Sequence, residues 1–370
     1  MIQKDRLLTL FGQLVSIDSP SFYERDAADF VKAKLSELNI AVQEDNAGVK
    51  SNGNCGNLYA CIEGTLKLPP LLFCAHLDTV EPSHGKKAVS GKNGIITSDG
   101  TTILGADDFA GVAAICEALF ALKEAGIPHR PLELLFTVSE EKYSVGVKLF
   151  DFSKIKSREA YVFDLSGPVG DAAYEAPTIL SFKAKFIGRA AHAGFVPQEG
   201  IHAIKAAAEA ISKIRCGKYD GMTVNIGTIS GGTATNIIPD SCVITGEIRS
   251  NSDENAHQKL DEISKTIRDA VVMAGAAVEL ESTVHITAFK TELSHSAVKR
   301  FENACRQLHL QSNLCSTFGG SDLNTLTLHG INGIVLATAM NNCHSCAEYT
   351  SERELLRITE LAFSLMTAKD

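Results

Sequence analysis

Residues 71–80 read LLFCAHLDTV, a short apolar run that ends at a histidine and an aspartate. Such a run is typical of a buried strand in a parallel sheet, because both faces of that sheet are covered and the usual alternation is lost. His76 and Asp78 are two residues apart, so both side chains project to the same side of an extended segment. This stretch predicts a buried strand that carries polar groups at its carboxyl end.

The same pattern recurs farther along the chain. Residues 132–138 (LELLFTV) and 160–163 (AYVF) are further short apolar runs. Between the first two runs, residues 109–125 (FAGVAAICEALFALKEA) predict a helix that ends at Gly126 and Pro128. Strands that alternate with helices favour an α/β layer with a mostly parallel sheet.

The pattern changes after Pro177. Residues 179–187 (ILSFKAKFI) alternate apolar and polar side chains, as a half-exposed antiparallel strand does. The predicted order is then β-α-β-β-α-β, with helices near 200–214 and 254–274 and strands near 222–229, 241–249 and 277–287. Such a unit can form its own four-stranded sheet. We therefore predict a discontinuous α/β domain, residues 1–176 and 290–370, and an inserted α+β domain, residues 177–289.

Composition narrows the classes of function. The chain has 370 residues, 45% of them hydrophobic and 21% charged, which is typical of globular proteins. A net charge of -9 argues against nucleic-acid binding, and no run approaches the ~20 apolar residues of a membrane span. The first residues lack the apolar core of a signal peptide, and ten cysteines without an export signal indicate reduced thiols. We expect a cytoplasmic protein that binds neither nucleic acid nor membrane.

More polar groups follow the other predicted strands. Asp107 and Asp108 open the predicted helix, Glu140 and Glu141 follow the strand LELLFTV, Asp164 follows AYVF, and His344 follows the strand at 333–340. Ligands of open α/β sheets bind at the carboxyl ends of the strands. Imidazole and carboxylate groups are ligands that zinc accepts.

Each of these groups taken alone is more typical of a helix cap or a solvated turn. Gathered at one sheet edge, uncompensated carboxylates would repel one another and raise one another's pKa. Bound cations would remove that penalty, so the combination predicts a metal site. Cys343 and Cys346 flank His344 as C-x-x-C, but a structural zinc site or redox use is only weakly indicated because no second ligand pair accompanies them.

Several stretches together resemble one known family. The sequence is similar to a peptidase T-like member of the di-zinc metallopeptidase family that includes carboxypeptidase G, the aminoacylases and succinyl-diaminopimelate desuccinylase. The matching stretches are AHLDTV (75–80), LGADDFAGVAA (104–114), TVSEE (137–141), GRAAHAGFVPQEG (188–200), GTISGGTATNIIPD (227–240), GEIRS (246–250), GGSDLN (319–324) and CHSCAE (343–348). The resemblance implies a zinc-exopeptidase-like catalytic domain, and a lid or dimerisation role, with a homodimer, for the inserted domain.

The resemblance also implies the metal ligands. His76 and Asp164 would hold one zinc ion, Glu141 and His344 the other, and Asp107 would bridge both. The expected cofactor is two Zn2+ per chain, with Co2+ or Mn2+ as alternatives that the same donors accept.

Five further residues receive roles by the same resemblance. Asp78 would accept a hydrogen bond from His76, and Glu140 would be the general base on the attacking water. His192 would help to bind the tetrahedral oxyanion, from its own chain or from a dimer partner. Asn236 and Arg249 would hold the free carboxylate of the substrate.

The sequence departs from the family pattern at three positions without losing a ligand. Phe109 stands where a lysine is common, and Leu165 and Ala339 stand where glycine is common. These changes concern substrate preference more than the metal site.

We therefore expect a metal-dependent exopeptidase that acts on short peptides in the manner of a tripeptide aminopeptidase. An N-acyl-amino-acid deacylase would use every one of these ligands, although Asp164 favours the aminopeptidase side of the family, since deacylases more often carry glutamate there. A non-catalytic metal-binding protein is the remote alternative, and the presence of Glu140 and Asp78 argues against it.

Overall fold

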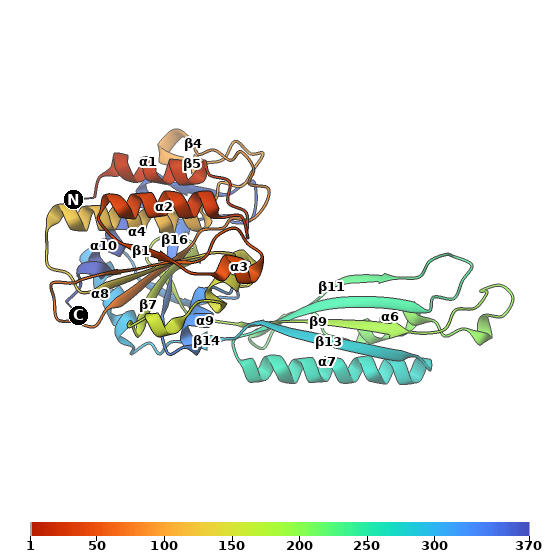
Figure 1. Ribbon diagram of the computed structural model, residues 1–370. Coiled ribbons are helices and arrows are strands. Elements are labelled where there is room, and N and C mark those ends of the chain that lie inside the picture. The colour runs from red at the N-terminus through yellow and green to blue at the C-terminus, as the bar shows by residue number, and fades with distance from the viewer. Residues whose placement is uncertain (1, 370) are drawn as a thin grey trace. The chain divides into compact units, whose positions relative to one another are not determined.

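The computed structural model describes residues 2–369, which form two compact units (Figure 1). Of the described residues, the first unit contains 2–175, Lys290–Thr317 and 321–369. The second contains Ala176–Phe289 together with the three residues Phe318–Gly320.

A nine-stranded mixed sheet forms the centre of the first unit. Its order is β1-β2-β6-β3-β7-β16-β8-β14, and β15 pairs with β8. The strands are β1 (Val42–Glu44), β2 (Leu58–Ile62), β3 (Leu71–His76), β6 (Leu132–Thr137), β7 (Glu159–Ser166), β8 (Asp171–Ala176), β14 (Phe289–Lys290), β15 (Asn313–Ser316) and β16 (Asn332–Met340). The central strands β6, β3, β7 and β16 are mutually parallel, while β1, β2 and β8 add antiparallel pairs. The predicted α/β class is confirmed, with a sheet that is parallel at its centre.

The apolar runs explain why these strands are central. Every residue of β3 and of β6 is buried, so neither strand has a polar face to turn to water. Their parallel register pairs His76 with Thr137, and β16 runs parallel to β7 on the other side. The carboxyl ends of these strands therefore meet at one edge of the sheet, and the polar residues that follow them are gathered there.

Helix α4 (Ala106–Ala125) is buried around most of its circumference. It packs against β3 and β16 and is covered by α1 (Lys4–Val15) and α10 (Glu352–Thr367), which explains its nearly continuous apolar sequence. It ends at Gly126, whose φ of +59° is the left-handed cap that glycine favours. The other helices of this unit are α2 (Arg25–Glu37), α3 (Ala47–Ser51), α5 (Val145–Lys148), α8 (Ser296–Gln307) and α9 (Asp322–Leu328). A small sheet joins β4 (Val89–Ser90), β5 (Ile95–Thr97) and β17 (Tyr349–Ser351).

The second unit is an antiparallel sheet with two helices on one face (Figure 1). Its strands are β9 (Thr178–Ile187), β10 (Gly217–Tyr219), β11 (Met222–Gly231), β12 (Ser241–Ser250) and β13 (Ala277–Ile286), in the order β10-β11-β12-β9-β13. Helices α6 (Ala203–Lys213) and α7 (Asp253–Ala274) pack on each other and on β9 and β12.

The prediction of a four-stranded sheet in this unit was wrong by one strand. The extra strand is β10, which pairs with β11 across a tight turn at Asp220 and Gly221, both with positive φ. Three residues are too few to show an alternation of apolar and polar side chains, so the sequence pattern gave no signal for it.

Apolar and polar side chains alternate along β9, so the strand has one buried face and one solvent-exposed face. Leu180, Phe182, Ala184 and Phe186 are buried in the core of the second unit. On the other face the ammonium of Lys183 lies 3.5 Å from the carboxylate of Glu281 on β13, and both side chains are exposed.

Among the described residues, no helix has both the length and the apolar character that crossing a membrane requires.

Candidate metal centre

The structure brings the five predicted ligands together at the carboxyl edge of the central strands. His76 is the last residue of β3, Asp164 lies in β7, and Glu141 lies in the short 3-10 turn Glu140–Lys142 after β6. Asp107 is in the first turn of α4, and His344 is in the loop that follows β16. Four separate strand ends and one helix start therefore contribute to one cluster.

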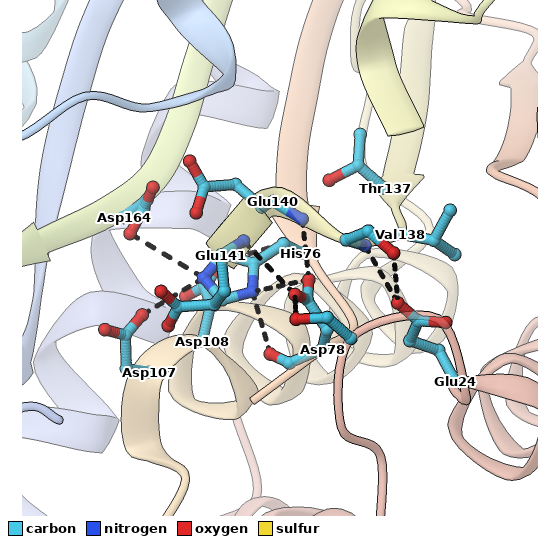
Figure 2. A network of polar contacts seen from close by, with 12 residues as sticks. Glu24, His76, Asp78, Asp107, Asp108, Thr137, Val138, Glu140, Glu141 and Asp164 are labelled. Carbon is cyan, nitrogen blue, oxygen red and sulfur yellow. Dashed lines mark hydrogen bonds and ion pairs between the residues drawn. The ribbon is translucent and has the colours of Figure 1, made fainter. Parts of the chain in front are cut away.

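Asp107 faces a different histidine with each of its carboxylate oxygens. Its Oδ1 lies 3.1 Å from His76 Nε2, and its Oδ2 lies 3.3 Å from His344 Nε2. His76 Nε2 is also 3.8 Å from Asp164 Oδ1, and His344 Nε2 is 2.9 Å from Glu141 Oε1. Figure 2 shows Asp107 and Asp164 approaching His76 from the same side, away from Asp78.

These separations can be compared with those of ligands around a metal ion. Two ligand atoms at ordinary Zn–N and Zn–O lengths in a tetrahedral site lie about 3.4 Å apart. The four nitrogen–oxygen distances, from 2.9 to 3.8 Å, lie on both sides of that value. The donors are imidazole and carboxylate groups in two sets that share Asp107. In chemistry and spacing, the residues fit divalent metal ions.

Burial and crowding shift the titration of the ligands. Burial raises the pKa of Asp164 to about 7, although the contact with His76 opposes this. Burial would also raise the pKa of Asp107, but its contacts with His344 and His76 hold that pKa well below the usual range. Asp107 and Glu141 raise the pKa of His344 to about 10. The cluster is therefore strongly anionic unless cations, whether protons or metal ions, neutralise it.

Glu140 and Glu141 have different surroundings although they are adjacent. A carboxylate oxygen of Glu140 lies with ligand atoms of His76 and Asp164 in a group whose members are within 4.8 Å of one another. Figure 2 shows the Glu140 side chain extending toward Asp164. The hydroxyl of Ser144 donates to Glu140 Oε1 at 3.1 Å, whereas Glu141 contacts His344. Burial raises the pKa of Glu140 well above its ordinary value.

Asp78 faces His76 with its main-chain oxygen and with its carboxylate. His76 Nδ1 lies 2.9 Å from the main-chain oxygen of Asp78 and 3.5 Å from its carboxylate. Hydrogen bonding to the carbonyl places the proton on Nδ1 and leaves Nε2 to face the metal site. The carboxylate also accepts from the main-chain N–H groups of Glu140 at 2.9 Å and Glu141 at 3.1 Å, and from Ser21 Oγ at 2.7 Å. Asp78 thus anchors the 3-10 turn Glu140–Lys142, which we call the glutamate turn.

Sequence reasoning assigned no supporting role to the buried carboxylates around the predicted ligands. Glu24 accepts from the main-chain N–H of Ser139 at 2.9 Å, and Asp108 accepts from that of His76 at 3.1 Å. Asp322 accepts from Thr137 Oγ1 at 2.5 Å, and Glu348 accepts three main-chain bonds. Asp322 and Glu348 lie inside the matching stretches GGSDLN and CHSCAE, so the motifs marked them without revealing their contacts.

The C-x-x-C pair has little support as a redox or thiolate site. Cys343 Sγ lies 3.3 Å from Ser166 Oγ, and burial raises the pKa of the Cys343 thiol far above its ordinary value. A protonated, half-buried thiol is a poor nucleophile and a poor metal ligand.

The other three predicted site residues belong to the second unit. His192 Nδ1 accepts from the Gly194 N–H at 3.1 Å, and the exposed Phe195 ring packs on the imidazole with centroids 4.3 Å apart. The main-chain oxygen of Asn236 accepts from the N–H next to His192, at Ala193. These contacts place the His192 and Asn236 segments side by side.

Arg249, on β12, already has partners within the second unit. Its Nε donates to Glu247 Oε1 at 2.6 Å and its Nη1 donates to the Phe318 carbonyl at 2.8 Å. A substrate carboxylate would have to share the guanidinium with these two acceptors.

Comparison with known proteins places this site in a family. Residues 174–273 match the family profile described as the peptidase dimerisation domain of M20 peptidases. The chain is 36% identical to the uncharacterised protein YqjE of Bacillus subtilis, with 99% of each chain covered.

Two solved structures are similar over almost the whole chain. The aminopeptidase PepT of Bacillus cereus is 34% identical with a TM-score of 0.93, and 99% of this chain and 98% of that chain are covered. A tripeptidase of Staphylococcus aureus is 33% identical with a TM-score of 0.96 and the same coverage. Together with the anionic cluster at the sheet edge, these likenesses show that the chain belongs to the M20 family of metallopeptidases, among its peptidase T-like members.

Proposed function

We propose that the protein is a two-zinc exopeptidase that removes the N-terminal residue from tripeptides and other short peptides. The observation that carries the proposal is the Asp107 carboxylate, which faces His76 with one oxygen and His344 with the other. The names of the two similar structures, an aminopeptidase and a tripeptidase, support the substrate class.

We propose two ion positions for these residues. His76 and Asp164 would hold one ion, Glu141 and His344 the other, and Asp107 would contact both. Two divalent ions held there would make a water acidic enough to lose its proton near pH 7 and would polarise the scissile carbonyl.

Glu140 is the proposed general base. It would take the proton of the attacking water and deliver it to the leaving nitrogen of the scissile amide. Its main chain is fixed by the Asp78 carboxylate and its side chain by the Ser144 hydroxyl, so the carboxylate is held in place before substrate binds.

His192 is the proposed oxyanion donor. Because Nδ1 accepts the Gly194 N–H, the ring proton lies on Nε2, where it can be donated to the oxygen of the tetrahedral intermediate. Asn236 and Arg249 are proposed to bind the free carboxylate of the peptide.

We further propose that residues 1–176 and 290–370 are the catalytic domain and residues 177–289 a lid through which a homodimer forms. The family profile over residues 174–273 supports dimerisation. Sedimentation of the purified protein as a monomer at micromolar concentration would contradict this part of the proposal.

One experiment tests the activity. Protein stripped of metal would be reconstituted with Zn2+, Co2+ or Mn2+, its bound metal counted, and its release of the first residue from trialanine compared with its hydrolysis of N-acetylalanine. We expect two ions per chain and preferential cleavage of the tripeptide. Preference for the acetylated amino acid would support a deacylase, and full activity with one ion or none would refute the two-metal site.

A further inference from the structure

Glu348 joins two segments that carry proposed metal ligands. It lies four residues after His344 and is only 1% exposed. Its Oε2 accepts from the main-chain N–H groups of Leu104 at 2.8 Å and Gly105 at 2.7 Å, and its Oε1 accepts from that of Asp107 at 3.0 Å. One carboxylate therefore ties the segment that bears Asp107 to the loop that bears His344.

A second contact also restricts the Asp107 segment. Gly105 has a φ of +79°, and a Cβ atom there would lie 2.9 Å from Lys86 Cε and 3.4 Å from Thr79 Cγ2. Lys86 is itself buried, with its ammonium over the Phe109 ring at 5.4 Å from the centroid. The segment is thus hydrogen-bonded to the Glu348 carboxylate and packed against Lys86 and Thr79, and it has little room to shift.

We propose that Glu348 is a positioning residue that fixes the Asp107 carboxylate relative to His344 and thereby sets the affinity of the ion position made by Asp107, Glu141 and His344. The inference rests on the proposed two-metal function and adds a residue to which the motif comparison gave no role. Metal–ligand distances tolerate errors of only about 0.2 Å, so a small shift of the Asp107 segment would weaken this position.

The other ion position should depend less on Glu348. His76 and Asp164 lie in β3 and β7, whose parallel register is fixed by the sheet itself. Only their shared ligand, Asp107, belongs to the segment that Glu348 holds. Loss of Glu348 should therefore affect the two ions unequally, which a general loss of stability would not do.

The test variant is Glu348→Gln, which keeps the shape of the side chain. The amide NH2 of the glutamine must face either the Asp107 N–H or the two N–H groups of Leu104 and Gly105. At least one N–H···O hydrogen bond is therefore lost, and two hydrogen-bond donors face each other in its place. The matched control is Glu133→Gln. Glu133 is 2% exposed and accepts from the main-chain N–H groups of Lys156 at 3.0 Å and Ser157 at 2.6 Å, but it lies near the amino end of β6.

The measurement is a Zn2+ titration of metal-free protein in competition with a chromophoric chelator, which gives the number and affinity of bound ions. We expect the wild-type protein and Glu133→Gln to bind two ions alike. Glu348→Gln should bind the second ion roughly 10- to 100-fold more weakly, the usual effect of removing a residue that supports a metal ligand. The first ion should keep nearly its wild-type affinity.

Unchanged affinity for both ions in Glu348→Gln would overturn the inference, and so would an equal loss in Glu133→Gln, which would indicate general destabilisation. If circular dichroism shows that Glu348→Gln does not fold, Glu348→Asp decides instead. It retains the charge but is too short to reach all three donors, so the same selective loss is expected and wild-type affinities would overturn the inference. A wild-type protein that binds fewer than two ions would refute the proposed function itself.

Discussion

Replacing Lys86 by methionine is expected to change how the stability of the metal-free protein depends on pH. Lys86 is buried in the first unit, its ammonium donates to the Ile17 carbonyl, and it lies over the Phe109 ring. Burial lowers the pKa of Lys86 from 10.5 to about 8, although the charges of Asp18, Glu81 and Glu348 oppose this. The shift corresponds to roughly 3 kcal/mol of charge-burial cost at neutral pH.

The sign of the effect follows from proton binding. Below about pH 8 the ammonium is charged in both the folded and the unfolded chain, so the full cost is present. Between about pH 8 and 10.5 the unfolded chain holds a proton that the folded chain does not, so the free energy of unfolding gains about 1.4 kcal/mol per pH unit from this residue. Methionine cannot titrate, so Lys86→Met lacks this rise.

The assay is urea unfolding, followed by circular dichroism in the presence of a chelator, at several pH values from 7 to 10. The absolute stability of the variant is a poor readout, because methionine also leaves the Ile17 carbonyl without its donor. Taking the difference in unfolding free energy between wild type and variant cancels the contributions of the other titrating groups, which both proteins share. It should rise by roughly 2–3 kcal/mol across this pH range. Parallel pH profiles would refute the reasoning and would mean that Lys86 is not charged and buried as described.

Five further variants have expected outcomes. Glu140→Gln should lower kcat by roughly 10²–10⁴-fold with metal content retained, whereas Glu141→Gln should lose metal. Metal analysis and kinetics on both variants check this, and reversed phenotypes would exchange the two assignments. Ser144→Ala should lower kcat by roughly ten- to hundredfold at unchanged metal content, because the Glu140 carboxylate loses one hydrogen bond. His192→Ala should lower kcat by roughly 10²–10³-fold with little change in KM, and a change in KM alone would assign it to ground-state binding. Arg249→Ala should lower kcat/KM for a free tripeptide by roughly ten- to two-hundred-fold and spare an amidated one, and equal losses for both peptides would show that Arg249 does not read the carboxylate.

The parts of the fold that could be predicted are those whose signal is local. Short, mostly apolar runs predicted that β3, β6 and β16 are buried strands, and the parallel direction of such strands placed His76, Glu141 and Asp164 at one edge. The short strand β10 could not be predicted, because three residues are too few to show an alternation of apolar and polar side chains. The segment Phe318–Gly320, which clusters with the second unit, escaped because its contact with Arg249 joins residues far apart in sequence.

The sequence could predict which polar residues cluster at the sheet edge but not which residues support them. A motif can mark Asp78, yet only the structure shows that its main-chain carbonyl contacts His76 and that its carboxylate reaches the glutamate turn. Main-chain N–H groups are present at every residue except proline, so nothing in a sequence indicates which of them a distant carboxylate will accept from.

These supporting residues share one arrangement, which explains why the site contains buried carboxylates that are not predicted to bind metal. Glu24 accepts from the N–H of Ser139, Asp78 from those of Glu140 and Glu141, and Glu348 from those of the Asp107 segment. A carboxylate that accepts several N–H bonds is compensated for burial and at the same time fixes the backbone that donates them. The loops that carry the predicted ligands are therefore held by carboxylates, and three of the five predicted ligands are carboxylates as well. Burial raises the pKa of Asp164 to about 7, and the contacts with Asp107 and Glu141 raise the pKa of His344 to about 10, so the metal-free cluster holds protons in place of metal ions. Metal binding should displace those protons without rearranging the loops, and the free energy of binding is then not spent on ordering them.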